Sequence, residues 1–424
     1  MVVVCPEVVV CFGAFVFMSQ KSTKTAISFD PLPDVLSALA RGEMVLIADD
    51  ERRENEGDLI VAAEKVTPAH INFMARYGRG LICIAMDHEN LARLGLARMV
   101  PHGGGDPYRT AFMESVDARY GVTTGISAPD RARTARVLVD EASSAADLVR
   151  PGHLFPLEAV EGGVLRRAGH TESAVDLCRL AGLKPAGVIC EVMREDGHMA
   201  RLDELMPFAR EHGLKVSSVA AIIQHRRQTE RLIELEEEIN FPTDLGLFRM
   251  RMYRSTMDDK CHLALVMGEP AAQPSPLVRV HSECLTGDAF GSLRCDCGPQ
   301  LRTAMERIAE EQHGILLYMR QEGRGIGLAQ KIRAYALQEA GLDTVEANEQ
   351  LGFEADGRDY SLAAQMLLDL GVSHCRLITN NPLKISGLET YGVDVMERIA
   401  IHAGASAHNA RYMETKKVKM GHML

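Results

Sequence analysis

Short apolar runs alternate with helical patterns from residue 31 to the end of the chain. In the first half the pattern predicts strands at 44–48 and 81–85 and helices at 68–77 and 172–183, the last with Thr171 as its cap. In the second half it predicts strands at 262–267, 277–281, 315–319 and 375–379 and helices at 301–310, 327–340 and 361–370. This alternation is typical of α/β or α+β proteins, so we expect two consecutive globular domains, each a mixed sheet flanked by helices.

A charged segment, residues 226–238, interrupts the pattern near the middle of the chain. It is rich in Glu and Arg and offers few apolar side chains to bury, as expected of an exposed connection between domains. We therefore predict a first domain over 31–229 and a second over 230–424, each large enough for a core of its own.

The first seventeen residues are apolar, but no Lys or Arg precedes them and they contain Pro6 and Glu7. A secretory signal begins with a positively charged region, which is missing here. We expect an unstructured leader over residues 1–30, with a signal or membrane anchor as the alternative. No later stretch is long and apolar enough to cross a bilayer.

Composition and charge limit the kinds of partner that this protein could bind. The 424 residues are 46% hydrophobic and 25% charged, which excludes a disordered chain. The net charge is -11, Trp is absent and aromatic residues make up 5%, so the basic and stacking surfaces of a nucleic-acid binder are missing. Ten unevenly spaced cysteines suit a reducing cytosol rather than a disulfide scaffold. We predict a cytoplasmic protein with no nucleic-acid or membrane partner.

Polar side chains in the first half gather where predicted strands end and a predicted helix begins. Carboxylates and arginines crowd residues 49–58, and further polar groups follow at 150–156, at 166–171 and at Cys190-Glu191. Oxygen ligands suit Mg²⁺, and a helix N-terminus beside arginines suits a phosphate. A solvated charged turn is the alternative for 49–58 taken alone. Together the groups indicate metal-assisted chemistry on a sugar phosphate.

Five motifs make the first half resemble a known family. They are RENEGD at 53–58, TTGIS at 123–127, RPGHLFP at 150–156, RAGHT at 167–171 and CE at 190–191. In this order they resemble 3,4-dihydroxy-2-butanone-4-phosphate synthase, a lyase that converts ribulose 5-phosphate to its four-carbon product and formate.

That resemblance implies the roles of individual residues. Glu54 and His170 would hold Mg²⁺ or Mn²⁺, and Glu191 and His153 would move protons. The residues implied in contact with ribulose 5-phosphate are Arg53, Glu54, Asp58, Arg167, Ala168, Gly169, His170, Thr171 and Glu191.

Three cysteines in the second half have the spacing of a metal site. Cys284, Cys295 and Cys297 supply three soft thiolates without an obvious fourth protein ligand, which is typical of a catalytic zinc site with an open position. Three unrelated buried cysteines are the alternative. His281-Ser-Glu283 imitates the H-x-E of zinc nucleobase deaminases, but the P-C-x-x-C that these enzymes need is missing.

The sequence around these cysteines resembles GTP cyclohydrolase II over roughly residues 242–424. The motifs are RVHSECLTGD at 279–288, SLRCDCG at 292–298, RQEGRGIG at 320–327, KIRAY at 331–335, the segment 348–360 and TNNP at 379–382. The family is a hydrolase that opens the imidazole ring of GTP and releases formate, pyrophosphate and 2,5-diamino-6-(5-phosphoribosylamino)pyrimidin-4(3H)-one.

This second resemblance implies Zn²⁺ on the three cysteines. Tyr335 would orient the base or the water, Asp356 would be the general base, and Arg358 would act at the α-phosphate. The implied GTP contacts are Arg279, Val280, His281, Ser282, Glu283, Gln300, Glu322, Gly323, Arg324, Thr344, Thr379 and Lys384.

The presence of both families on one chain is the pattern of bifunctional riboflavin-biosynthesis enzymes. It implies a homodimer that acts on two small-molecule substrates, ribulose 5-phosphate and GTP. One alternative stays open, in which only the GTP cyclohydrolase II half is active and the first half is a dimerisation or regulatory module. Departures from the first family's pattern, Arg79-Gly80 and the segment 109–114, motivate it.

Overall fold

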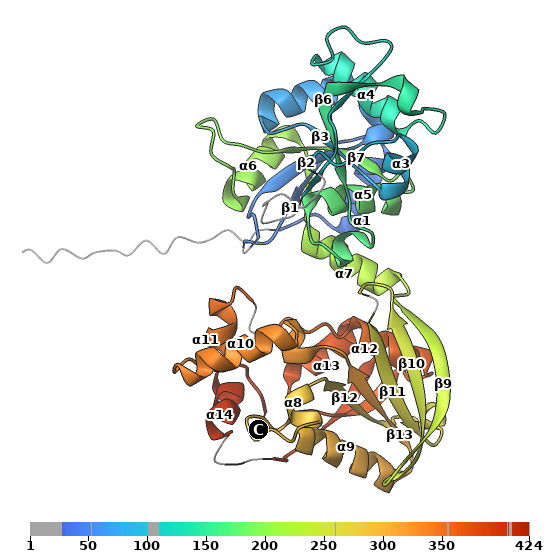
Figure 1. Ribbon diagram of the computed structural model, residues 1–424, viewed down its shortest axis with the longest axis vertical. Coiled ribbons are helices and arrows are strands. Elements are labelled where there is room, and N and C mark those ends of the chain that lie inside the picture. Colours follow the sequence, from blue (N-terminus) through green and yellow to red (C-terminus); the bar gives the residue numbers. More distant parts are fainter. Residues whose placement is uncertain are drawn as a thin grey trace, which may run out of the picture.

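The computed structural model describes residues 28–423, apart from residues 52, 101–109, 259, 354–355, 405 and 407–408. Figure 1 shows two bodies that follow each other along the long axis of the molecule, with helix α7 (Val219–Thr229) between them. Each body contains one mixed sheet with helices packed against it. The predicted fold class is therefore confirmed.

The first sheet has eight strands in the described part of the chain, in the order β4-β6-β3-β7-β2-β1-β8, with β5 paired to β6. Two strand pairs, β1 with β8 and β3 with β6, are parallel, and the others are antiparallel. The strands are β1 (Val45–Ala48), β2 (Gly57–Ala62), β3 (Cys83–Met86), β4 (Ala111–Phe112), β5 (Val116–Ala118), β6 (Leu148–Glu158), β7 (Ala186–Glu191) and β8 (Lys215–Ser218). The helices of this body are α1 (Leu32–Ala40), α2 (Pro68–Phe73), α3 (His88–Arg93), α4 (Ala128–Val139), α5 (His170–Leu180), α6 (Leu202–His212) and α7.

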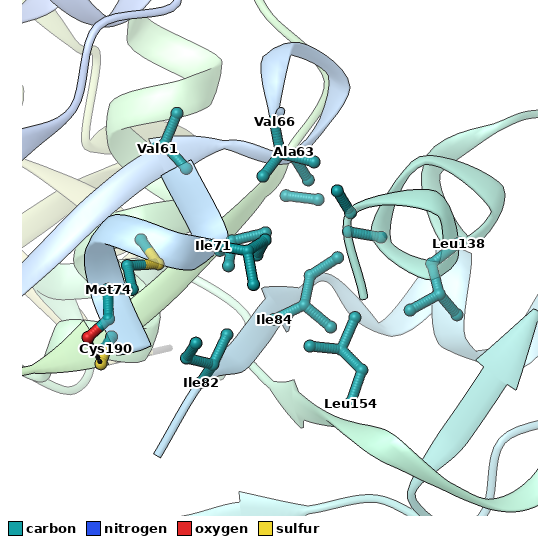
Figure 2. Close-up of a cluster of buried hydrophobic side chains, with 14 of the residues drawn as sticks. Val61, Ala63, Val66, Ile71, Met74, Ile82, Ile84, Leu138, Leu154 and Cys190 are labelled. Atoms are coloured by element: carbon teal, nitrogen blue, oxygen red, sulfur yellow. Dashed lines mark hydrogen bonds between the residues drawn. The ribbon is translucent and has the colours of Figure 1, made fainter. Parts of the chain in front are cut away.

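Both faces of this sheet are buried, and the two faces carry separate apolar clusters. Along β2, Leu59 and Val61 belong to one cluster, while Ile60 and Ala62 belong to the other, because successive strand side chains point to opposite faces. Helices α2, α3, α4 and α6 cover the first face, and α1, α5 and α7 cover the second. Figure 2 shows part of the first cluster, where Ile71 of α2, Ile84 of β3 and Leu138 of α4 meet.

The second sheet has seven strands among the described residues, in the order β15-β14-β12-β13-β11-β10-β9. Its β12–β15 half is parallel, and β9, β10 and β11 form an antiparallel extension in which β9 is the outermost strand. The strands are β9 (Ile233–Thr243), β10 (Gly246–Ser255), β11 (Cys261–Met267), β12 (Leu277–Ser282), β13 (Gly314–Met319), β14 (His374–Ile378) and β15 (Asp394–Ile399). The helices are α8 (Leu285–Asp288), α9 (Cys297–Glu311), α10 (Leu328–Glu339), α11 (Thr344–Gln350), α12 (Ser361–Asp369), α13 (Pro382–Thr390) and α14 (Ala410–Val418).

The structure differs from the sequence prediction at three places. The charged segment is largely exposed, but it is part of regular structure, because α7 continues to Thr229 and β9 begins at Ile233. Helix α5 begins at His170 with Gly169 as its N-cap, so Thr171 lies inside the helix and is not the cap. The helix expected at 68–77 is α2 followed by a π-helical turn over Met74–Gly78.

Most of the expected leader lies outside the described residues. Its last residue, Asp30, is already part of the fold, since its backbone amide donates to the Val216 carbonyl at 2.8 Å and its carboxylate pairs with Lys215. Within the described residues no helix combines the length and apolar character that a membrane span requires.

Candidate functional site

The turn between β1 and β2 builds the acidic side of the first site. Asp49, at the end of β1, accepts hydrogen bonds from the backbone amides of Glu54 and Glu56 at 3.2 and 2.9 Å. It also accepts one from the Arg53 guanidinium at 2.8 Å. Arg53 pairs with Glu54 at 2.8 Å in turn. These bonds fix the turn so that the Glu54 carboxylate faces the start of α5.

His170, the first residue of α5, completes this cluster. Its Nδ1 lies 3.6 Å from Glu54 Oε2 and 3.6 Å from Asp58 Oδ1. Ligand atoms of Asp49, Glu54 and His170 all lie within 4.8 Å of one another. The structure thus brings the two predicted metal ligands together and adds Asp49, which the sequence showed only as the first residue of an acidic run.

Burial and charge shift the pKa values in this cluster. Burial, with help from the neighbouring carboxylates, raises the pKa of Asp58 to about 7. Burial lowers the pKa of His170, but Asp58 and Glu54 outweigh it and raise that pKa to about 9. Two buried atoms, Asp58 Oδ1 and His170 Nε2, have no hydrogen-bond partner among the described residues. Oxygen and imidazole donors with unsatisfied buried atoms fit a divalent cation.

Two arginines converge on the N-terminus of α5. A Cβ placed on Gly169 would lie 2.5 Å from Arg167 NH1 and 3.1 Å from Arg53 NH2, so the guanidinium groups come close to the backbone there. Arg167 is oriented by the fully buried Glu172, at 2.6 Å. Thr171 is buried in the first turn, whereas Ala168 is exposed beside it. Free N–H groups at a helix N-terminus beside two cations are a combination that suits a phosphate.

Glu191 and His153, the expected proton carriers, lie in different surroundings. Glu191 ends β7 opposite Asp58 and accepts a hydrogen bond from the Leu81 amide at 2.8 Å. His153 lies on β6, where its Nδ1 is 2.7 Å from Asp117 Oδ2 and its side chain is 43% exposed. The hydrogen bonds that orient His153 both go to Asp117 and do not reach the Glu54 and His170 cluster.

The three cysteines of the second half meet as predicted. The Sγ atoms of Cys284, Cys295 and Cys297 lie within 4.8 Å of one another, with 3.6 Å between those of Cys284 and Cys295. Gly287 permits this approach, because a Cβ there would lie 2.8 Å from the Cys295 Sγ. Three thiols from the segment 284–297 are a donor set that fits Zn²⁺.

A buried lysine that the sequence analysis did not single out lies beside the thiols. Lys331 donates to Cys284 Sγ at 3.0 Å, to Thr286 Oγ1 at 3.0 Å and to Glu322 Oε1 at 2.7 Å. Burial lowers the pKa of Lys331, but Glu322 and Cys284 outweigh it and raise that pKa above its ordinary value. Hydrogen bonds from the other two thiols, and from Lys331, hold the pKa of Cys284 below its ordinary value. The sequence signal for this lysine was its place in the KIRAY motif.

A pocket opens in front of the thiols and collects most of the residues expected to contact GTP. Tyr335 and Arg358 line it, and so do Arg279, His281, Ser282, Glu283, Gln300, Glu322, Gly323, Arg324, Thr344, Thr379 and Lys384. Val280 is different, since its side chain is fully buried in the core and its carbonyl accepts from Lys384 Nζ at 2.7 Å. Asp356 reaches the pocket through Arg358, whose Nε donates to it at 2.7 Å.

The sequence analysis did not single out two residues, Asp288 and Tyr318, that lie beside the pocket residue His281. His281, on β12, faces Asp288 through its Nε2 at 3.1 Å, and Tyr318 donates to the same carboxylate at 2.9 Å. Burial lowers the pKa of His281, and its Nδ1 has no hydrogen-bond partner among the described residues. Asp288 and Tyr318 thus orient His281. Asp288 ends the same motif, 279–288, whereas Tyr318 comes from β13 and no local motif places it there.

Comparison with known proteins identifies a family for each half of the chain. The profile of 3,4-dihydroxy-2-butanone 4-phosphate synthase matches residues 33–225, and that of GTP cyclohydrolase II matches residues 234–400. The riboflavin biosynthesis proteins RibBA of Bacillus cereus (strain AH187) and Bacillus subtilis (strain 168) are each 53% identical to this chain. The alignments cover 396 and 397 residues, which are 93% of this chain and 99% of each relative.

A solved structure supports the arrangement of both halves. It is RibBX, described as a two domain 3,4-dihydroxy-2-butanone 4-phosphate synthase from A. baumannii. The TM-score is 0.68 at 35% sequence identity, and the match covers 88% of this chain and all of that one. With two family profiles in sequence and full-length relatives, the chain belongs to the bifunctional riboflavin-biosynthesis proteins that combine 3,4-dihydroxy-2-butanone 4-phosphate synthase with GTP cyclohydrolase II.

Proposed function

We propose that the two activities are divided between the two clusters, with the synthase reaction at the start of α5 and the cyclohydrolase reaction at the three thiols. The observation that carries this proposal is the difference in donor atoms. Carboxylates and an imidazole gather in the first body, and three thiols gather in the second. Hard cations prefer the former set and Zn²⁺ accepts the latter.

In the first site, the cradle formed by Arg53, Arg167 and the α5 N-terminus would hold the phosphate of ribulose 5-phosphate. Glu54 and His170, with Asp49 beside them, would hold Mg²⁺ or Mn²⁺. When bound, the cation supplies a Lewis acid that polarises the substrate's oxygens.

Proton transfer in this site is proposed for Glu191 and His153. The Glu191 carboxylate is held by the Leu81 amide, so it keeps one orientation as a base. Asp117 fixes the His153 ring through Nδ1 and leaves Nε2 as the nitrogen that exchanges a proton.

In the second site, the pocket cations would hold the GTP triphosphate although the chain as a whole is acidic. Cys284, Cys295 and Cys297 would hold Zn²⁺, which when bound lowers the pKa of water. Tyr335 and Thr286 face each other at 3.3 Å, which orients the tyrosine hydroxyl.

Asp356 and Arg358 form an ion pair beside this pocket, with Asp356 as the proposed general base. Burial lowers the pKa of Arg358, but Tyr360 and Asp356 outweigh it and raise that pKa above its ordinary value. The guanidinium therefore stays charged, and we assign it charge stabilisation at the α-phosphate rather than covalent attack.

The direct test is formate release measured separately with ribulose 5-phosphate plus Mg²⁺ and with GTP plus Zn²⁺. Formate is expected from both substrates. Release from GTP alone would instead support the alternative in which the first half is a dimerisation or regulatory module.

We also propose the domain limits 31–229 and 230–424. All residues of the first site lie before this boundary, and all residues of the second site lie after it. Arg227 of α7 pairs with Asp359 at 3.1 Å, and Gln365 donates to the Arg227 carbonyl at 3.3 Å, so contacts cross this boundary. Fragments 18–229 and 230–424 are each expected to fold and catalyse, with the second less stable than in the whole chain. If the folded fragments work only when mixed, the sites are shared across the boundary.

The homodimer and the cytoplasmic location are predictions from the family. Light scattering of the purified protein measures the first, and cell fractionation measures the second. Neither nucleic acid nor a membrane is proposed as a partner.

A further inference from the structure

The C-terminal helix α14 forms one wall of the cyclohydrolase pocket, although it lies beyond residue 400, where the family match ends. Tyr412, Lys416, Met420 and His422 all line the pocket. The segment is held in place at its far end, where the Met423 amide donates to the Asn380 carbonyl at 2.9 Å. Figure 1 shows α14 in the second body, next to α11.

One charged contact joins α14 to the segment 284–297, the cysteine loop, which carries the three thiols. Lys416 Nζ lies 2.6 Å from Asp296 Oδ1, and the side chains of the two residues are 10% and 0% exposed. Asp296 stands between Cys295 and Cys297 in sequence and is the N-cap of α9. A buried carboxylate needs a partner of opposite charge, and Lys416 supplies it.

The same carboxylate orients two residues expected to contact GTP. Its Oδ2 accepts from Gln300 Nε2 at 2.7 Å, so the Gln300 Oε1 is left to accept from Arg279 NH2, also at 2.7 Å. Arg279 in turn donates through NH1 to the Ile378 carbonyl at 2.9 Å. The chain of contacts therefore runs from α14 through the cysteine loop to β12.

We propose that Lys416 is a positioning residue of the cyclohydrolase site, which holds Asp296 between the zinc ligands and, through Gln300, sets the Arg279 guanidinium toward GTP. The inference rests on the proposed GTP site. It makes α14 a structural part of the GTP site, because Lys416 positions residues that contact the substrate.

The test uses the full-length protein with four variants. Lys416→Met removes the charge at similar length, Lys416→Gln keeps a hydrogen-bond donor without charge, and Lys416→Arg keeps the charge. Lys417→Met changes the exposed neighbour on the same helix and is the matched control. The measurements are KM and kcat for GTP, affinity for a non-hydrolysable GTP analogue, zinc retained against a chelator, and formate from ribulose 5-phosphate.

Lys416→Met is expected to raise KM for GTP about tenfold or more and to release zinc faster, with a smaller effect on kcat. Lys416→Arg should recover most of both losses, and Lys417→Met should match the unchanged protein. Formate from ribulose 5-phosphate should stay constant in all four and shows that the first half is intact.

Analogue affinity and zinc retention equal to the unchanged protein in Lys416→Met would overturn the proposal. If that variant unfolds the second half, Lys416→Gln decides by the same two measurements. Equal losses in Lys416→Arg and Lys416→Met would also overturn it, because the position would then serve packing alone. Absence of GTP turnover in the unchanged protein would refute the proposed function instead, while zinc retention would still report on Lys416.

Discussion

His262, a buried histidine on β11, is expected to make the second body less stable in acid. Its side chain is 1% exposed and its Nδ1 accepts the Arg320 backbone amide at 3.0 Å, where the pocket loop 320–327 begins. Burial, with the nearby charges of Lys260 and Arg320, lowers the pKa of His262 to about 4 from the ordinary 6.5. Protonation would bury a charge and remove the acceptor of the Arg320 amide.

The sign and size of the effect follow from this pKa. Because the unfolded chain binds the proton more tightly, stability is fully present above pH 6.5 and is lost as pH falls toward 4. The whole difference corresponds to about 3 kcal/mol, and about 2 kcal/mol of it is lost by pH 5. That is a large share of the stability of an ordinary domain.

The assay is urea unfolding at pH 7.5 and pH 5, followed by hydrogen exchange of peptides from β11 and β13. The unchanged protein is compared with His262→Gln, which keeps an acceptor but does not titrate. The exposed His402 changed to Gln is the control in the same body. His262→Gln should lose about 2 kcal/mol less than the unchanged protein over this interval, and His402→Gln should lose as much as the unchanged protein. An equal loss in all three proteins would refute the reasoning.

Three further changes separate the two activities. Cys295→Ser should abolish formate release from GTP while ribulose 5-phosphate turnover persists, because zinc on two thiolates binds weakly; normal GTP turnover in the zinc-free variant would disprove the assignment. Glu54→Ala should eliminate formate from ribulose 5-phosphate and spare GTP hydrolysis, and retention of most synthase activity would show that the metal is held elsewhere. Gly80→Ala should lower synthase activity at least tenfold, since its Cβ would lie 2.5 Å from Glu191 Oε2; unchanged kcat would show that Glu191 is free to move.

Much of the fold could be predicted because apolar runs in this chain coincide with buried strands. The runs at 277–281 and 315–319 are central strands of the second sheet, and both are buried. The charged segment could not be placed the same way. In β9 only Ile233 is fully buried, so the strand shows no apolar run, and its pairing with β10 supplies the structure.

The candidate sites, like the fold, could be predicted from the sequence only in part. Motifs predicted that the three thiols would gather, and also Glu54 and His170, because each of these residues lies within a short, specific motif. Lys416 could not be predicted, since it meets Asp296 across 120 residues of sequence. Such contacts are set by how the elements pack, and no local pattern in either segment encodes them.

The charges on strand β9 also bear on whether copies of the protein aggregate through their sheet edges. As the outermost strand of its sheet it presents a row of backbone groups that a second sheet edge could pair with. Glu234, Glu237 and Glu238 lie along it, and Glu238 reaches across to Arg251 at 2.5 Å. Two such edges brought together would set like charges against each other. The Glu-rich run at 234–238 kept the strand from being predicted from the sequence. In the folded protein its charges oppose edge-to-edge aggregation.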